Sequence, residues 1–120
     1  MKGDGANAIE MSLLDLDSEI LETTLAESRF ALVEFWAEWC LFSRLLYPKS
    51  RRLAARYGER LLVARCHLDG GEAVIDRIGV RYLPAVMLFR GQKPLRRWYG
   101  DTPERLFVRA IESLTESANA

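Results

Sequence analysis

Residues 31–48 read ALVEFWAEWCLFSRLLYP, and this stretch decides how the chain folds. Its opening is β-rich and nearly continuously apolar, as expected of a strand buried on both faces. From Phe42 onward apolar residues recur near helical spacing, so a helix is expected to begin at Cys40. A thiol at a strand-to-helix junction lies where unpaired backbone N–H groups and the helix dipole favour an anion. Arg44, one turn along, adds a positive charge, so we expect an exposed or half-exposed reactive thiolate at Cys40.

Two segments and a glycine resemble the thioredoxin family. The run LVEFWAEWC at 32–40 resembles the thioredoxin approach to the active site, and RYLPAVMLF at 81–89 resembles its proline loop and following strand. Gly100 matches a glycine beyond the last hairpin. The resemblance covers residues 12–114 and implies a thioredoxin-like three-layer α/β sandwich, with a central mixed β-sheet flanked by helices.

The site departs from the family pattern at one position. Thioredoxins usually carry WCGPC, whereas residues 39–43 here read WCLFS, so Ser43 replaces the second cysteine. The thiolate of Cys40 can attack a disulfide and form a mixed disulfide. Ser43 can hydrogen-bond that thiolate but cannot resolve the mixed disulfide, so the dithiol cycle is not available within this chain. A cysteine-to-serine change here is also a common device for trapping partners; the equally unusual Leu41 and Phe42 argue for a natural divergent site.

Composition and charge indicate one ordinary globular domain. The chain has 120 residues, 49% of them apolar, and a formal net charge of zero, so nothing points to a nucleic-acid partner. The N-terminus lacks the apolar core of a signal peptide, and no run approaches the roughly 20 apolar residues of a membrane span. Two cysteines do not form a disulfide framework. These features predict a cytoplasmic protein without a membrane partner.

Periodicity and turn residues predict strands and helices in the order of an α/β sandwich. In chain order we expect strand 9–14, helix 17–26, strand 31–36, helix 40–58, strand 61–69, helix 72–78, strand 85–89, strand 95–99 and helix 103–114. The thioredoxin-like domain is expected to cover 12–114. Residues 1–11 are expected to form a disordered or short segment, and residues 115–120 to fray.

The second cysteine is predicted to be structural. Alternation along its strand places Cys66 on one face and Arg65 and His67 on the other. By the resemblance, Arg65 occupies the position of a lysine beneath the active site, so Cys66 points away from Cys40. A disulfide requires Cα atoms within about 7 Å. Neighbouring Cys66 and His67 cannot share a metal from opposite faces, so neither a metal nor another cofactor is expected.

Glu34 interrupts an otherwise apolar strand, and a buried carboxylate needs a partner. The resemblance implies an acidic residue beneath the thiols that assists proton transfer. An ion pair with Arg65 that serves mainly the fold is equally compatible with the sequence. Arg65 is the expected partner in both interpretations.

The resemblance also implies a substrate-binding rim around Cys40. It places a cis Leu83–Pro84 bond opposite the cysteine, which leaves the backbone of Leu83 free to pair with an extended peptide. The expected rim consists of Trp39, Leu41, Phe42, Tyr82, Leu83, Pro84, Tyr99 and Gly100. Exposed apolar patches of this kind often mark protein contact sites. Packing of Phe42 into the core is an equally open alternative.

Two functions follow. The first is thiol–disulfide exchange through one cysteine, as a monothiol protein-disulfide oxidoreductase or isomerase in cell redox homeostasis. Cys40 would attack a protein or glutathione disulfide, and an external thiol such as glutathione would release it. The alternative is a non-catalytic thioredoxin-like adaptor or chaperone that holds a protein at the apolar rim. An adaptor has no need of a thiol, so the presence of Cys40 favours the first.

Overall fold

The apolar segment at the start of the quoted stretch forms the central strand of a five-stranded mixed sheet. The computed structural model describes residues 13–68 and 76–119. Its elements are β1 (Leu13–Leu16), α2 (Ser18–Ala26), β2 (Phe30–Trp36), α3 (Ser43–Tyr57), the 3-10 helix η1 (Gly58–Arg60), β3 (Leu62–His67), β4 (Ala85–Arg90), β5 (Lys93–Tyr99) and α5 (Glu104–Asn119).

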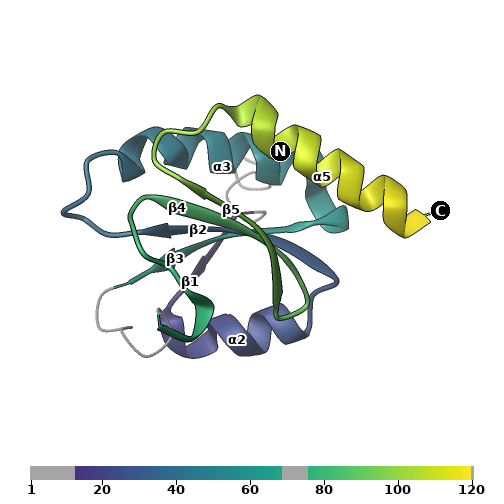
Figure 1. Ribbon diagram of the computed structural model, residues 1–120, viewed down its shortest axis with the longest axis horizontal. Coiled ribbons are helices and arrows are strands. Elements are labelled where there is room, and N and C mark those ends of the chain that lie inside the picture. The colour runs from purple at the N-terminus through teal and green to yellow at the C-terminus, as the bar shows by residue number, and fades with distance from the viewer. Residues whose placement is uncertain (1–12, 69–75, 120) are drawn as a thin grey trace, which may run out of the picture.

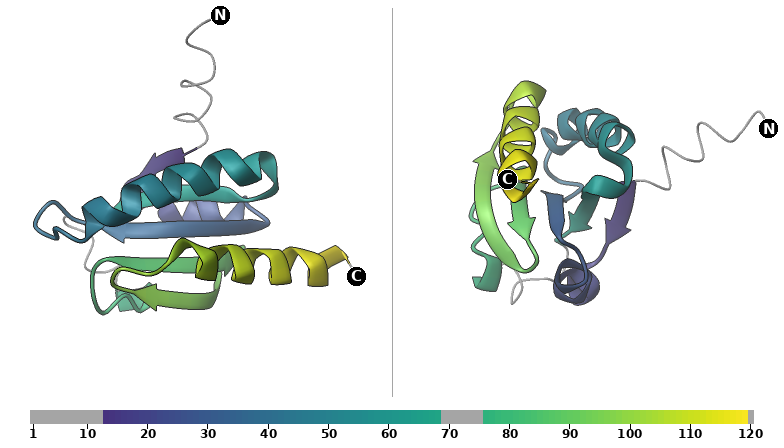
Figure 2. Two further views of the ribbon diagram at one scale, coloured as in Figure 1. Left: turned by 90° about the horizontal axis from the view of Figure 1, so that it is seen from above. Right: turned by 90° about the vertical axis from the view of Figure 1, so that its right-hand side faces the viewer.

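The strand order is β1-β3-β2-β4-β5. The first three strands are parallel, whereas β4 runs antiparallel to β2 and to β5. Helix α2 covers one face of the sheet, and α3 and α5 lie side by side over the other face (Figures 1 and 2). The predicted three-layer α/β sandwich with a mixed sheet is therefore confirmed.

Alternation along β2 distributes its side chains between two cores. Ala31, Val33 and Phe35 pack in the cluster that includes the buried leucines of α2. Phe30 and Leu32 pack in the cluster that includes residues of α3 and α5. The side chain of Glu34 shares the second face, so the fold brings this carboxylate beneath α3.

Polar contacts join α3 to α5 and to the loop that precedes α5. The Lys49 ammonium donates to the carboxylate of Asp101 at 2.8 Å and to the Thr102 carbonyl at 2.7 Å. The Tyr57 hydroxyl donates to Glu112 at 2.8 Å. These contacts fix α3, which carries the site, against the loop and helix at the end of the chain.

Several predicted boundaries differ or lie outside the described residues. The predicted segment 1–11, most of the first strand and most of the helix at 72–78 lie outside the described residues, although 76–78 are helical. Helix α5 continues to Asn119, past the point where fraying is expected. The expected strands and turns elsewhere agree within a few residues, and Pro94 lies on the edge strand, where its missing N–H is tolerated.

Candidate active site

The candidate nucleophile lies in a turn between β2 and α3, which we call the thiol turn (residues 37–42). The helix begins at Ser43, so the expectation that it begins at Cys40 is wrong by three residues. Short-range bonds explain this difference, because the N–H of Cys40 donates to the Ala37 carbonyl and the N–H of Ser43 to the Cys40 carbonyl, both at 3.1 Å. Such three-residue bonds make a tighter turn than an α-helix.

Cys40 is recessed between two protruding side chains. It is 8% exposed, whereas Trp39 is 74% exposed and Leu41 is 70% exposed. The expectation of an exposed or half-exposed thiol is therefore wrong. The turn folds Cys40 inward while its neighbours point to solvent, so a reagent must pass the rim to reach the sulfur.

Three strand ends meet beside the thiol turn. Phe35 near the end of β2 pairs with Ala85 at the start of β4, and Ala85 pairs with Tyr99 at the end of β5. The Leu83–Pro84 peptide bond that precedes β4 is cis. The N–H of Gly100 donates to the Pro84 carbonyl at 2.9 Å, from a backbone with a φ of +79°. Pro84 and Gly100 are thus joined directly at the edge from which the thiol turn leaves the sheet.

The side chains around this edge form an apolar rim. Phe42 is 58% exposed, so its packing into the core, one of the two alternatives for it, does not occur. Tyr82 is exposed and meets Tyr99 edge-on, with ring centroids 5.5 Å apart. Leu83 is half-buried against the α2-side core. The rim therefore offers apolar surface to solvent close to a recessed thiol.

Beneath α3 lies a buried carboxylate. Glu34 is 1% exposed, and its Oε1 accepts from the Ser50 hydroxyl at 2.8 Å and from Arg65 Nε at 3.2 Å. Its Oε2 accepts from a terminal nitrogen of Arg65 at 3.4 Å. Burial raises the pKa of Glu34, although Arg65 and Ser50 oppose the change; Asp15 adds to it. The expected ion pair between Glu34 and Arg65 is present.

Two aromatic rings hold the guanidinium of Arg65. Its central carbon lies 4.4 Å from the ring centroid of Trp36 and 4.5 Å from that of Tyr47. Contacts of a cation with ring faces at such distances are attractive and restrict the side chain. Arg65 is therefore fixed in position between β2 and α3.

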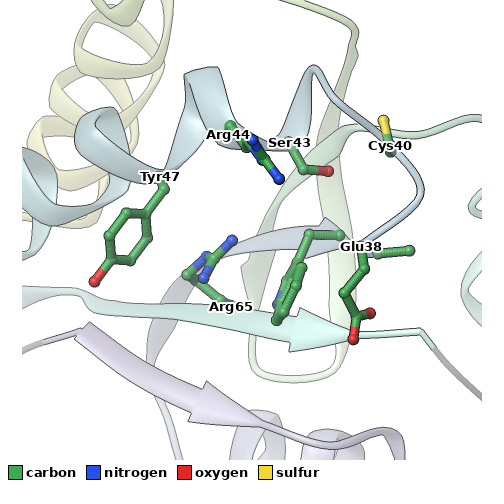
Figure 3. Close-up of a pocket in the computed structure, with 8 residues that line it drawn as sticks. Glu38, Cys40, Ser43, Arg44, Tyr47 and Arg65 are labelled. Atoms are coloured by element: carbon green, nitrogen blue, oxygen red, sulfur yellow. The ribbon is translucent and has the colours of Figure 1, made fainter.

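A pocket of about 290 Å³ opens between α3 and the ends of β2 and β3 (Figure 3). Its lining residues are Trp36, Ala37, Glu38, Cys40, Ser43, Arg44, Tyr47 and Arg65. Ser43 is 3% exposed, and its hydroxyl has no hydrogen-bond partner in the described part of the chain. The hydrogen bond to the Cys40 sulfur that the sequence allows is therefore not formed.

Cys66 is fully buried in the α2-side core, on the sheet face opposite Arg65, as alternation predicts. Both cysteines are free thiols. Burial, with a smaller contribution from Asp17, raises the pKa of Cys66 to about 12. His67 pairs with Glu38. Within 13–68 and 76–119, no three histidine, cysteine or acidic side chains gather closely enough to hold a metal ion.

Sequence reasoning missed three residues that shape the site. Trp36 and Tyr47 enclose Arg65, and Ser50 donates to Glu34. A signal was present for Ser50, because Ser43 and Ser50 occupy the same stripe of α3 as its buried leucines. A serine at an apolar stripe position indicates a polar partner in the layer below.

Comparisons with known proteins agree with this geometry. The family model described as Thioredoxin matches residues 12–113. A thioredoxin-like protein of Synechocystis is 34% identical over 84 residues, which cover 69% of this chain and 77% of that protein. The chloroplastic M-type thioredoxin of Chlamydomonas reinhardtii is 29% identical, with 80% of this chain and 69% of that protein covered.

Solved structures show the same fold. A mutant thioredoxin from Halobacterium salinarum superposes with a TM-score of 0.74 at 25% identity, covering 84% of this chain and 88% of that one. A chain from the complex of ferredoxin:thioredoxin reductase with thioredoxin f2 superposes with a TM-score of 0.77 at 15% identity, covering 86% and 94%.

The chain therefore belongs to the thioredoxin family. It is a member of a family of redox proteins that work with thiol and disulfide partners. No helix in the described segments is both long and apolar enough to cross a membrane.

Proposed function

We propose that this protein exchanges thiols and disulfides through Cys40 alone. The observation that supports the proposal is the distribution of the three relevant side chains. Cys40 lies in the thiol turn, Ser43 occupies the position of a resolving cysteine, and Cys66 is buried on the opposite face of the sheet. No second thiol of the chain is placed to complete a dithiol cycle.

The reaction has two steps. The Cys40 thiolate attacks one sulfur of a protein disulfide, which forms a mixed disulfide and releases the other client sulfur as a thiolate that takes up a proton. An external thiolate, such as that of glutathione, then attacks the mixed disulfide. The sulfur of either Cys40 or the client leaves as a thiolate, which then takes up a proton from water. Because one disulfide is exchanged for another, electrons balance at each step. The setting proposed for this chemistry is the cytoplasm.

The surrounding residues have supporting roles in this proposal. The client lies across Trp39, Leu41 and Phe42 and pairs with the backbone of Leu83 beside Pro84 and Gly100. Glu34, whose pKa is raised, and its partner Arg65 assist proton transfer beneath the site. The hydroxyl of Ser43, which lacks a partner among the described residues, is available to bond the sulfur of an intermediate.

Insertion of the missing cysteine tests this function. Wild-type protein should form a stable adduct with a protein disulfide, found by mass spectrometry, that an added thiol releases. Ser43→Cys should convert the stall into turnover in insulin reduction with a thioredoxin reductant supplied, and should yield a 40–43 disulfide. Cys66→Ala is the matched control and should retain the adduct. Absence of an adduct in the wild type together with no gain in the variant would refute the exchange function.

A non-catalytic adaptor or chaperone is the second candidate, and a specific observation favours it. Cys40 is recessed, whereas the neighbouring rim residues Trp39, Leu41 and Phe42 are strongly exposed. An adaptor should bind its partner equally well after Cys40→Ser and lose binding after Leu41→Ser with Phe42→Ser. Pull-down of a partner under reducing conditions by both the wild type and Cys40→Ser would support this candidate over exchange.

A further inference from the structure

The pocket beside Cys40 is lined by two positive charges that reach it from different elements. Figure 3 shows the guanidinium groups of Arg44, on α3, and Arg65, on β3, directed toward the same hollow. The pocket lies on the α3–β3 side of the thiol, away from the apolar rim. None of the rim residues proposed to bind the client lines this pocket.

The two arginines are only partly neutralised by the protein. In the described part of the chain Arg44 forms no ion pair, and Arg65 donates to Glu34 through Nε and one terminal nitrogen. Arginine has five N–H donors, so most of those of Arg65 remain for another acceptor. Asp15 lies opposite Arg65 in the sheet but is exposed, so Glu34 is the buried acid that shares the charge of Arg65.

The acidic residue among those that line the pocket is Glu38. The Glu38 carboxylate is turned from the two arginines and pairs with His67 (Figure 3). Arg44 is therefore the pocket charge that no acid of the described residues pairs, whereas Arg65 shares its charge with Glu34.

An unsatisfied polar group lies in the same pocket. The Ser43 hydroxyl is almost fully buried and has no partner in the described residues, although buried polar groups in folded proteins are normally hydrogen-bonded. A hydroxyl can donate to an anion as readily as accept. Two guanidinium groups and one unpaired hydroxyl together match the acceptor oxygens of a carboxylate.

We infer that this pocket is a subsite for the carboxylate of a small disulfide or thiol whose sulfur reacts at Cys40. The inference rests on the proposed exchange function and names its low-molecular-weight partner class. The volume of about 290 Å³ lies at the lower end for ligand pockets, which suits a short acid rather than a folded protein segment. The carboxylate anchors the molecule, and its sulfur lies toward the thiol turn.

The reaction at this subsite is balanced. The Cys40 thiolate attacks the small disulfide, the bond between Cys40 and the anchored sulfur forms, and the disulfide bond breaks. The departing half leaves as a thiolate and takes a proton from water. A second small thiolate attacks the adduct, which regenerates the Cys40 thiolate and forms the small disulfide again.

Three small disulfides that differ in charge test the subsite. Intact-mass measurement follows adduct formation at Cys40 with the dicarboxylate dithiodipropionate, with neutral hydroxyethyl disulfide and with cationic cystamine. Each rate is divided by the rate at which the same disulfide reacts with a neutral cysteine peptide. A hydrogen bond to a charged group that forms in the transition state raises a rate by about tenfold or more. We expect dithiodipropionate to react about tenfold faster than the neutral disulfide, and cystamine more slowly.

Matched arginine variants test whether the preference for the dicarboxylate arises in this pocket. Arg44→Gln should reduce the ratio of the dicarboxylate rate to the neutral rate to near one. Arg56→Gln removes the same charge from an exposed position further along α3 and should keep the ratio. A ratio near one in the wild type, or equal loss in both variants, would overturn the inference while adduct formation still supports the exchange function. Preference for an acidic peptide disulfide over dithiodipropionate would assign the carboxylate to a client protein and overturn it as well.

A second readout does not require reaction. Glutarate, a dicarboxylate without sulfur, should shift the NMR signal of the Arg65 Nε–H saturably in the wild type and in Arg56→Gln, and not in Arg44→Gln. Absence of a saturable shift in the wild type would overturn the subsite whatever the reaction rates. A saturable shift without any adduct would instead support the subsite and contradict the exchange function.

Discussion

Ser43 and Ser50 lie seven residues apart on the buried face of α3, and their hydroxyl groups have opposite environments. Ser50 donates to the carboxylate of Glu34 at 2.8 Å, whereas Ser43 has no partner in the described residues and lines the pocket beside Cys40. The hydroxyl of Ser50 therefore bonds a buried carboxylate. The hydroxyl of Ser43, next to the candidate nucleophile, forms no hydrogen bond within the described residues.

Alanine substitution should separate these two environments. Ser50→Ala removes a donor from a buried carboxylate and should lower the free energy of unfolding by about 1–3 kcal/mol. Ser43→Ala removes a hydroxyl that has no partner and should leave the free energy of unfolding unchanged or raise it by a few tenths of a kcal/mol. Urea denaturation of both variants measures the difference, and equal losses would contradict the assigned hydrogen bonding.

The raised pKa of Glu34 makes a signed prediction about pH. An unfolded glutamate titrates near pH 4.3, and the native group holds its proton to higher pH. Between the two values the native state binds more protons, so the contribution of Glu34 to stability falls as pH rises from about 4.3 and becomes constant once the native carboxyl has ionised. The free energy of unfolding of the wild type, minus that of Glu34→Gln, should therefore decrease from acidic toward neutral pH.

Urea denaturation of the two proteins at matched ionic strength tests this dependence. The two proteins differ only in this side chain, so the difference in the free energy of unfolding isolates the carboxyl group. A difference that increased with pH would mean that the ion pair with Arg65 outweighs burial and lowers the pKa.

Alkylation should distinguish the two cysteines. The pKa of Cys66 is raised to about 12, and its side chain is buried, so almost no thiolate exists there at pH 8. Iodoacetamide should add once to the folded protein, at Cys40, and twice after unfolding in guanidinium chloride. Peptide mapping by mass spectrometry identifies the site, and rapid modification of Cys66 in the folded protein would contradict its placement in the core.

Gly100 should be replaceable only at a conformational cost. Its φ of +79° is in the region that favours glycine, and an added Cβ would meet no heavy atom within 4 Å. Gly100→Ala should therefore lower the free energy of unfolding by about 1–2 kcal/mol through backbone strain alone. Gly100→Asn should lose less, because asparagine tolerates this conformation better, and equal losses in chemical denaturation would point to a steric cause instead.

The sequence by itself determined the layers of the fold and the presence of a single cysteine in the candidate site. A continuous apolar strand at 31–36 must be buried on both faces, and alternation on the neighbouring strand then places Arg65 toward one layer and Cys66 toward the other. Replacement of the second cysteine by Ser43 is a fact of covalent structure and needs no coordinates. The Glu34–Arg65 pair was also expected, because a charge in a buried strand requires a partner and the resemblance to thioredoxins implies that Arg65 lies beneath the site.

Only the tertiary structure decided the start of α3, the recession of Cys40 and the surroundings of Arg65. The helix boundary depends on which short-range backbone bonds the thiol turn forms, and periodicity does not resolve three residues at a helix end. The aromatic contacts of Arg65 join residues of β2, α3 and β3 that are distant in sequence. The unpaired hydroxyl of Ser43 likewise reflects which groups the packing of α3 on the sheet leaves within reach, and that is a property of three-dimensional distances alone.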